Sequence, residues 1–227
     1  NVFFYRLTNR IIHILTTTTP AGRLYEVDSR LRPGGASGLI VSSLEAFETY
    51  QREKAWTWEH QALVRARAMA GDAACTTKFA KLRRDILSRP RDPLKLKQDV
   101  CDMRTKMLLN LDQSTHTKFD IKQGRGGITD IEFIVQYGVL RWAAEYPSLL
   151  DKTAMLRLLG MFVKYQLFNE IACLELRNAF RIYRAEVHRL ALQNQPALVE
   201  QDKFSEHRQN VKHWWQEIIE EHEFKRC

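Results

Sequence analysis

The sequence predicts a mainly α-helical fold, in which a two-stranded remnant of an α+β unit is followed by a helical bundle. Three observations predict it. Apolar residues recur every three or four positions from Ser42 to the last residues, whereas one stretch alone, residues 24–41, alternates with the period of a strand. The 227 residues are 44% hydrophobic, enough to bury a sizeable core. We assign residues 1–70 to the first part and residues 71–227 to the bundle.

The first elements are a helix and a strand pair. A helix is expected from Asn1 to about Thr18, with its apolar residues on one side. Two strands are expected at Leu24–Leu31 and Gly38–Val41, joined by the glycine-rich turn Pro33–Gly38, whose glycines permit positive φ angles.

The remaining elements are helices with start signals in the sequence. Ser42-x-x-Glu45 reads as a capping box, Asp72 as an N-cap, and Asp92-Pro93 as a cap followed by proline at the first helical position. Later helices are expected around residues 131–142, 155–163, 176–190 and 203–223. Because amphipathic helices normally bury one stripe, we interpret the apolar stripes of the helices from Ser42 onward as core-facing.

The first predicted strand carries the clearest chemical signal. A period of two places Glu26, Asp28, Arg30 and Arg32 on one face, just before the glycine-rich turn. Alternating acid and base there suits a metal-bound substrate that carries several phosphates. The alternative is a solvated strand face on which Asp28 forms a salt bridge with Arg30 or Arg32.

A second constellation is the glycine loop, residues 120–132, with the sequence DIKQGRGGITDIE. Glycines before a helix expose backbone N–H groups that can cradle an anion, and Lys122 and Arg125 add positive charge. The alternative is a tight turn in which Asp130 and Glu132 cap the helix dipole.

A third cluster, Trp56-Thr-Trp58-Glu-His60 with Arg65 and Arg67, has no clear role in the sequence. Neighbouring tryptophans in a helical stretch more often pack in a core than stack on a base.

Composition excludes several classes of function. Nearly all of the net charge of +8 lies in residues 1–113, which suits a polyanion such as ATP. We do not expect nucleic acid, because no nucleic-acid motif accompanies the charge. No apolar run is long enough for a membrane span, and the four cysteines form no C-x-x-C pair, so we expect no membrane contact and a reducing cytoplasm.

Two runs, LYEVDSRLRPGGASGLIVSSLEAFETYQREKAWTWEHQALVRARAMAGD and FDIKQGRGGITDIEFIVQYGVLR, resemble the bacterial glutamine synthetase adenylyltransferases. Members of this family attach AMP to a tyrosine of glutamine synthetase and remove it, with two homologous nucleotidyltransferase units. The segments AWTWEHQALVRAR and GGITDIEF resemble those of the C-terminal, adenylylating unit. The deadenylylating unit, which uses phosphate to release ADP, is the alternative, and so is a purely helical interaction module.

The resemblance implies a polymerase-β-type nucleotidyltransferase that uses Mg²⁺ with ATP as substrate. In that type, two acids come from a Gly-Ser-Asp-x-Asp element and a third from a neighbouring strand. Asp28 matches the third position and is the predicted catalytic metal ligand. The chain contains no Gly-Ser-Asp, so the remaining ligands are expected upstream and the chain alone is expected to be inactive.

Further site residues follow from the two constellations. Arg30 and Arg32 are predicted to contact the nucleotide or to hold the strand face in register. Lys122, Gly126 and Gly127 are predicted to lie near the nucleotide. The resemblance also implies glutamine synthetase and the PII signalling protein as partners, and glutamine as effector.

Overall fold

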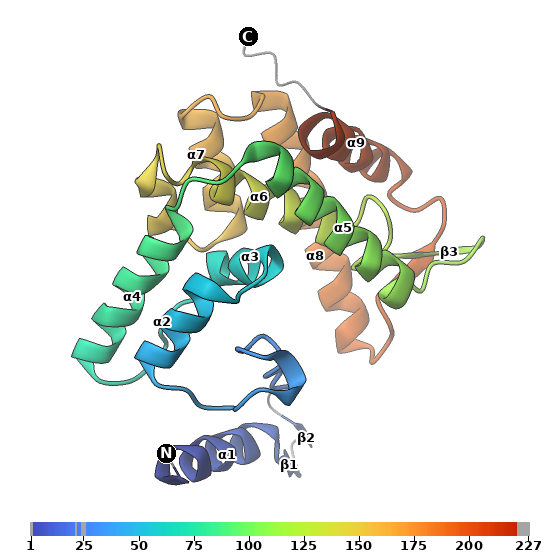
Figure 1. Cartoon of the computed structure of the whole chain (residues 1–227). Coiled ribbons are helices and arrows are strands. Elements are labelled where there is room, and N and C mark those ends of the chain that lie inside the picture. Colours follow the sequence, from blue (N-terminus) through green and yellow to red (C-terminus); the bar gives the residue numbers. More distant parts are fainter. Residues whose placement is uncertain (1, 21, 24–25, 222–227) are drawn as a thin grey trace.

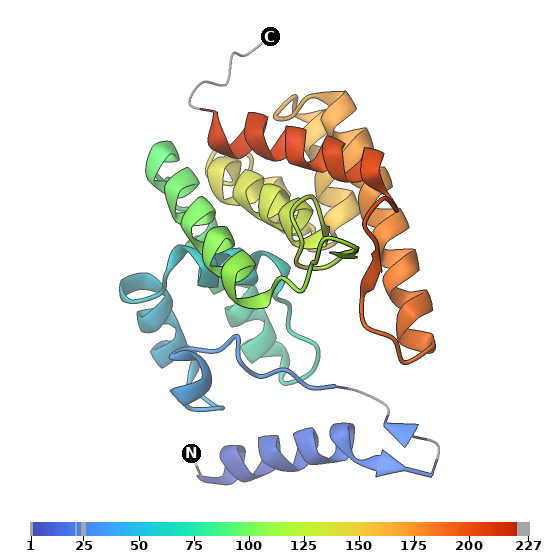
Figure 2. The ribbon, with the colours of Figure 1, turned by 90° about the vertical axis from the view of Figure 1, so that its right-hand side faces the viewer.

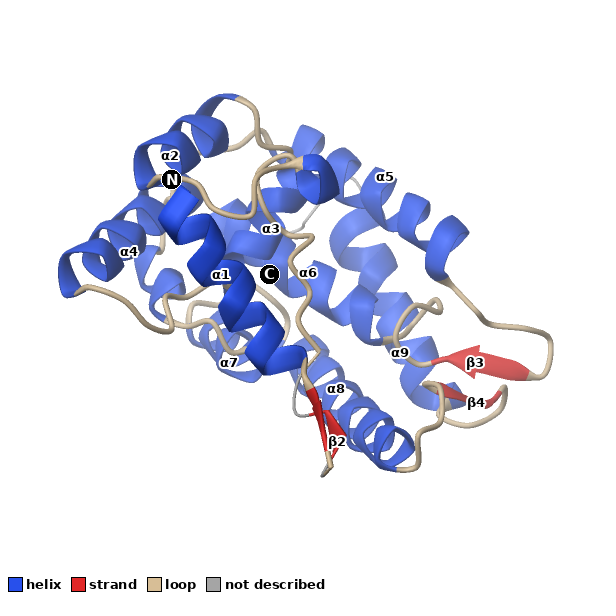
Figure 3. Ribbon diagram, turned by 90° about the horizontal axis from the view of Figure 1, so that it is seen from below, coloured by secondary structure: helices blue, strands red, loops and turns tan. Residues whose placement is uncertain are grey.

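The computed structural model describes residues 2–20, 22–23 and 26–221, and it is mainly helical, as predicted (Figures 1 and 3). The α-helices are α1 (Val2–Thr16), α2 (Leu44–Glu53), α3 (Thr57–Arg65), α4 (Ala73–Leu87), α5 (Pro93–Leu111), α6 (Ile128–Trp142), α7 (Met155–Lys164), α8 (Glu170–Leu192) and α9 (Ser205–Trp215). Short helical turns are η1 (Gly35–Ser37), η2 (Pro147–Asp151) and η3 (Gln216–Glu220), the last a π-helical turn. No helix in the described part of the chain is long and apolar enough to cross a membrane.

Helix α6 lies at the centre of the bundle (Figure 1). Its neighbours are α3, α5, α7, α8 and α9. Only Glu132 and Arg141 of its residues escape burial. A helix that is apolar on nearly every side is stable only when other elements cover it all round, so α6 organises the core.

The predicted apolar stripes of the helices from Ser42 onward are confirmed, whereas the apolar side of α1 is exposed. None of the described residues of α1 is buried, and Phe4 and Ile14 are 57% and 68% exposed. Figures 1 and 2 show why: α1 lies below the bundle and is joined to it by the segment that follows β2. Its stripe therefore has no cover within the described residues.

Two of the three predicted helix starts are confirmed, and one shifts by a residue. Asp72 accepts hydrogen bonds from Ala74 N and Cys75 N, and Asp92 accepts one from Lys95 N. The cap of α2 is Ser43 instead of Ser42, because the hydroxyl of Ser43 accepts the N–H of Ala46 at 3.1 Å.

The predicted strands Leu24–Leu31 and Gly38–Val41 are wrong. Leu24 and Tyr25 lie outside the described residues, and residues 26–31 and 38–41 have no strand pairing. The backbone bonds locally instead: the N–H of Arg30 donates to Asp28 Oδ1 at 2.9 Å, and the N–H of Arg32 donates to Arg30 O at 2.9 Å. An extended strand needs an edge to pair with, and no described strand offers one to this segment.

The observed strands are short and lie elsewhere. In two antiparallel pairs, β1 (Thr18–Thr19) joins β2 (Gly22–Arg23), and β3 (Lys118–Asp120) joins β4 (Leu198–Glu200). In the second pair Phe119 lies opposite Val199. Three residues are too few to show an alternating pattern, so the sequence could not reveal this pair.

Packing crosses the predicted boundary at residue 70. Helix α2 packs on α4, and α3 packs on α4, α5 and α6. The division into residues 1–70 and 71–227 stays a prediction.

A buried arginine holds this junction together. Arg83 of α4 is 6% exposed, and its Nε donates to Leu63 O at 3.0 Å. Its Nη2 donates to Val64 O at 2.5 Å and its Nη1 to Leu150 O at 2.9 Å. The guanidinium thus supplies the donor for Val64 O at the end of α3 and for Leu150 O in η2, and it adds a second bond to Leu63 O, which also accepts the N–H of Ala66. Burial lowers the pKa of Arg83.

We predict that Arg83→Met lowers the free energy of unfolding by several kcal/mol, because the buried carbonyls of Val64 and Leu150 lose their donor at a cost of about 1–3 kcal/mol each. The matched control is Arg84→Met, whose ion pair with Asp151 is about half exposed and is worth about 1 kcal/mol at most. Urea unfolding of both variants measures the difference, and equal losses would contradict the bonding role of Arg83.

Candidate functional site

Asp28 lies in the exposed segment between β2 and α2 and is paired with Arg30. Arg30 Nε donates to Asp28 Oδ1 at 3.0 Å, and Nη2 donates to Oδ2 at 2.7 Å. The side chain of Asp28 is 54% exposed and that of Arg30 is 79% exposed. The hydrogen bonds from Arg30 lower the pKa of Asp28 to about 2, so the carboxylate is ionised at any physiological pH.

Arg32 is bound within its own loop. Its Nε donates to Gly38 O at 3.0 Å, and its Nη1 donates to Ser29 O at 2.5 Å. Gly34 and Gly35 between them have φ angles of 77° and 58°, which favour glycine, so this part of the predicted turn is real. Arg32 thereby closes residues 29–38 into a compact loop beside the Asp28–Arg30 pair.

A magnesium ion requires several oxygen ligands, and the described residues supply few near Asp28. No group of three or more His, Cys, Asp or Glu side chains gathers anywhere in the described part of the chain. Asp28 can provide one carboxylate. These residues alone do not fit a complete magnesium site, and we derive no reaction step through the metal.

The glycine loop uses its own backbone donors. Gly126 N donates to Asp130 Oδ2 at 2.6 Å, and Gly127 N donates to Gly124 O at 2.9 Å. Lys122 N donates to Asp120 Oδ1 at 2.9 Å, while the side chain of Lys122 is exposed. Asp130 thus caps this turn, as the alternative interpretation expected of it, and the N–H groups of Gly126 and Gly127 are engaged within the protein.

Arg104 is a site residue that sequence reasoning missed. It lies on the buried stripe of α5, two turns beyond Leu96, and its side chain is 2% exposed. Arg104 Nε forms a buried ion pair with Asp130, and Nη2 donates to Gln123 O at 2.7 Å. An arginine in register with an apolar stripe was the signal that could have revealed it.

Asp130 and Gly126 are linked to further elements. Tyr183 of α8 donates its hydroxyl proton to Gly126 O at 3.0 Å. Burial raises the pKa of Asp130, while the neighbouring guanidinium of Arg104 opposes that rise. The loop between β3 and α6 is therefore fixed from both sides of the bundle.

The tryptophan cluster divides between surface and core. Trp56 is 70% exposed, contrary to the expected packing role, and Trp58 is half-buried. The carboxylate of Glu59 accepts the backbone N–H of Trp56 at 2.9 Å and the hydroxyl of Tyr50 at 2.9 Å. Arg65 pairs with Glu132 of α6 at 2.5 Å.

The structure does not bring the two predicted constellations together. Figure 1 shows the segment from β2 to α2 below α3, and the glycine loop beside β3 on the other side of α3. Asp28, Arg30 and Arg32 thus form one group, and Lys122, Gly126 and Gly127 form another.

We predict that Gly127→Ala destabilises the protein by about 1–3 kcal/mol, the usual cost of overpacking. The φ of Gly127 is −91°, so the obstacle is space: a Cβ would lie 2.6 Å from Ile121 O and 2.8 Å from Gly124 O. The control is Gly160→Ala in α7, where the nearest atom would be 3.6 Å away. Thermal unfolding should show a loss for the first variant and none for the second; equal melting temperatures would contradict the packing argument.

His60 gives a prediction for pH. Its Nε2 lies 3.0 Å from Gln51 O, its Nδ1 lies 3.3 Å from Arg91 Nη2, and burial lowers its pKa. A lowered pKa means that the unfolded chain takes up this proton first, so stability is present above the ordinary histidine pKa of about 6.5 and falls as the pH drops below it. Urea unfolding at pH 7 and pH 5 should show a larger loss in the wild type than in His60→Gln. An equal loss would exclude His60 as its source.

Two family models and several curated proteins match this chain. Residues 1–82 match the family model described as glutamate-ammonia ligase adenylyltransferase, and residues 95–221 match that of the GlnD PII-uridylyltransferases. The chain is 51% identical over 224 residues to the bifunctional glutamine synthetase adenylyltransferase/adenylyl-removing enzyme of Nitrosococcus oceani, covering 99% of this chain and 23% of the relative.

The enzymes of the same name from Hahella chejuensis and Thioalkalivibrio sulfidiphilus are 48% and 50% identical, over 97% and 96% of this chain. The chain spans about a quarter of the length of these relatives, 23% in each case. The chain matches the adenylyltransferase model at its start and the uridylyltransferase model after it, and about half of its residues are identical to those of bifunctional adenylyltransferases along almost its whole length. The chain therefore belongs to the glutamine synthetase adenylyltransferase family.

Proposed function

We propose that this chain is part of a nucleotidyltransferase that transfers AMP from Mg-ATP to a tyrosine of glutamine synthetase. The observation that carries this proposal is the identity of about half of all residues to bifunctional adenylyltransferases along almost the whole chain. That continuity includes the exposed Asp28 segment and the buried glycine loop.

Asp28 is proposed as one ligand of the magnesium that accompanies ATP, with the remaining acids upstream in the longer protein. Magnesium supplies the positive charge that offsets the triphosphate and the leaving pyrophosphate. Asp28 suits this role because its carboxylate is ionised and half exposed. Arg30 is proposed to turn from Asp28 toward a phosphate, and Arg32 to hold the loop in shape.

Lys122, Gly126 and Gly127 are proposed to lie near the nucleotide in the longer protein. Support differs among them. The ammonium of Lys122 is exposed and can reach an anion, whereas the glycine N–H groups are already bonded. The contribution of Gly126 and Gly127 is then to allow the close approach of backbone segments in the loop.

The proposed partners are glutamine synthetase as substrate and the PII signalling protein as regulator, with glutamine as effector and the cytoplasm as location. The names of the relatives include glutamine synthetase, which supports the first of these. We propose no nucleic-acid partner.

The adenylylating unit is preferred over the phosphorolytic unit because of the runs around Trp56 and Gly127. The bifunctional names of the relatives fit both units. The third candidate function is an interaction module without catalysis. The predominance of packed helices and the exposed apolar side of α1 support it.

One experiment tests all three readings. In the full-length protein, we expect Asp28→Asn to lower AMP transfer to glutamine synthetase by at least about a hundredfold, because an amide cannot supply the charge of a metal ligand. Phosphate-dependent release of AMP from adenylylated glutamine synthetase is measured in parallel with the same variant.

The matched control is Asp85→Asn, which alters an exposed aspartate of α4 and should leave both rates unchanged. Loss of release with transfer intact would assign the chain to the phosphorolytic unit. If Asp28→Asn changes neither rate while circular dichroism confirms its fold, the catalytic proposal fails and the interaction module is favoured.

A further inference from the structure

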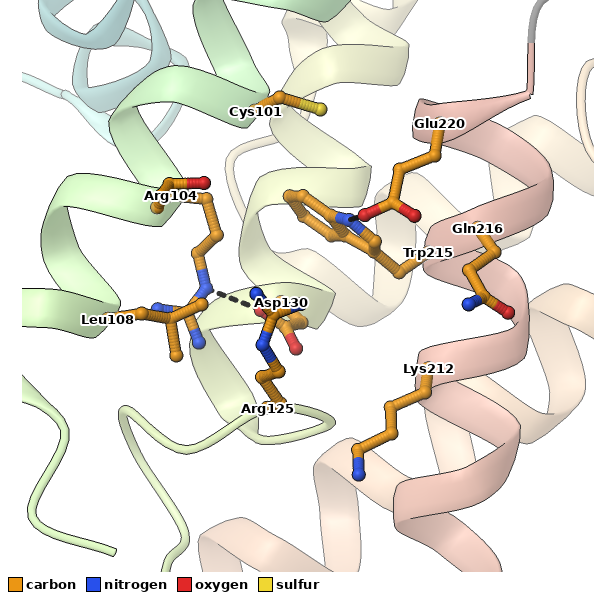
Figure 4. Close-up of a pocket in the computed structure, with 10 residues that line it drawn as sticks. Cys101, Arg104, Leu108, Arg125, Asp130, Lys212, Trp215, Gln216 and Glu220 are labelled. Carbon is orange, nitrogen blue, oxygen red and sulfur yellow. Dashed lines mark hydrogen bonds and ion pairs between the residues drawn. The ribbon is translucent and has the colours of Figure 1, made fainter.

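A cavity of about 250 Å³ lies in the bundle, and no residue of the Asp28 segment lines it. It is bounded by α5, the glycine loop, the start of α6 and the C-terminal helices α9 and η3 (Figure 4). The proposed nucleotide contacts described above use neither its lining cations nor its C-terminal wall.

The floor of the cavity contains a buried cation with an unused donor. Arg104 lines the cavity with its side chain 2% exposed. Its Nε and Nη2 bind Asp130 and Gln123, but Nη1 is buried and has no hydrogen-bond partner within the described part of the chain. A buried guanidinium N–H without an acceptor lowers the stability of the protein, so we expect a bound ligand to accept a hydrogen bond from it.

Two more cations face the same space. Figure 4 shows Arg125 on the glycine loop and Lys212 on α9, both directed toward the cavity from opposite walls. Neither side chain makes a hydrogen bond or ion pair within residues 2–20, 22–23 and 26–221. Burial lowers the pKa of Lys212, and the nearby Arg208 and Arg125 lower it further, while the carboxylate of Asp130 opposes this shift.

The two acids that line the cavity are already engaged. Asp130 is held by Arg104 and by Gly126 N, and Glu220 Oε1 accepts the indole N–H of Trp215 at 2.8 Å. Three cations thus converge on the cavity against two bonded carboxylates. That balance disfavours a metal ion and favours an anion.

We propose that this cavity is a binding site for a small oxoanion, a phosphate or a carboxylate, which accepts hydrogen bonds from Arg104 Nη1, Arg125 and Lys212. Planar guanidinium donors beside an ammonium match the oxygens of either group. The volume is below the range of about 300–1,000 Å³ typical of drug-sized ligands, so the ligand is smaller than a nucleoside triphosphate.

The test is isothermal titration of the whole chain at low salt with three separate probes: inorganic phosphate, acetate and ATP. We expect phosphate or acetate to bind, and Lys212→Gln and Arg125→Gln each to weaken that binding about tenfold or more, the loss of one charge-assisted hydrogen bond. The phosphate and acetate arms decide which oxoanion the site takes. Arg104 is left intact because Asp130 needs it as a partner.

Matched controls are Lys81→Gln on α4 and Arg157→Gln on α7, which change exposed cations outside the cavity. Ligand-induced stabilisation in thermal unfolding provides a second readout, since a ligand raises the melting temperature only where it binds the folded state. Equal binding by wild type, Lys212→Gln and Arg125→Gln would overturn the proposal. So would the absence of binding by phosphate and acetate, whether or not ATP binds.

Discussion

The buried ion pair between Arg104 and Asp130 is the interaction on which the bundle depends most. Both side chains are almost fully buried, at 2% and 6% exposed, and transferring two charges from water costs several kcal/mol for each ion. The surrounding bonds offset that cost: Gln123 O accepts from the guanidinium, and Gly126 N donates to the carboxylate. The pair thus fixes the position of α5 relative to α6 and shapes the loop between them.

Other contacts build on this loop. Tyr183 donates to Gly126 O from α8, and its ring packs edge-on against Phe119 and Phe204, at centroid distances of 6.3 and 5.6 Å. The guanidinium of Arg208 in α9 lies 3.9 Å from the centre of the Phe119 ring. Strand β3, the glycine loop, α8 and α9 are therefore connected through one cluster of rings and charges.

The sequence predicted the parts of this structure that local periodicity and capping determine. The stripes of α4–α9 and the caps at Asp72 and Asp92 follow from spacing alone, because each is settled within a turn or two of helix. The sequence could not decide between partners: the salt bridge of Asp28 with Arg30 was one of two alternatives that it left open, and nothing in it showed that α1 would lie uncovered. The same holds for the candidate site. The sequence predicted the acids next to the glycines, but it did not show that Arg104, which is distant in sequence, pairs with one of them.

The pairing of β3 with β4 has a consequence for the order of folding. It joins Phe119 to Val199 across about eighty residues, a closure that costs about 2 kcal/mol more in chain entropy than a ten-residue loop. Two strands of three residues cannot offset that cost alone. The β3–β4 pair therefore forms only once α6, α7 and α8 have packed and brought the two strands close together. It is a late step of folding, and a change that unfolds these helices also separates the strands.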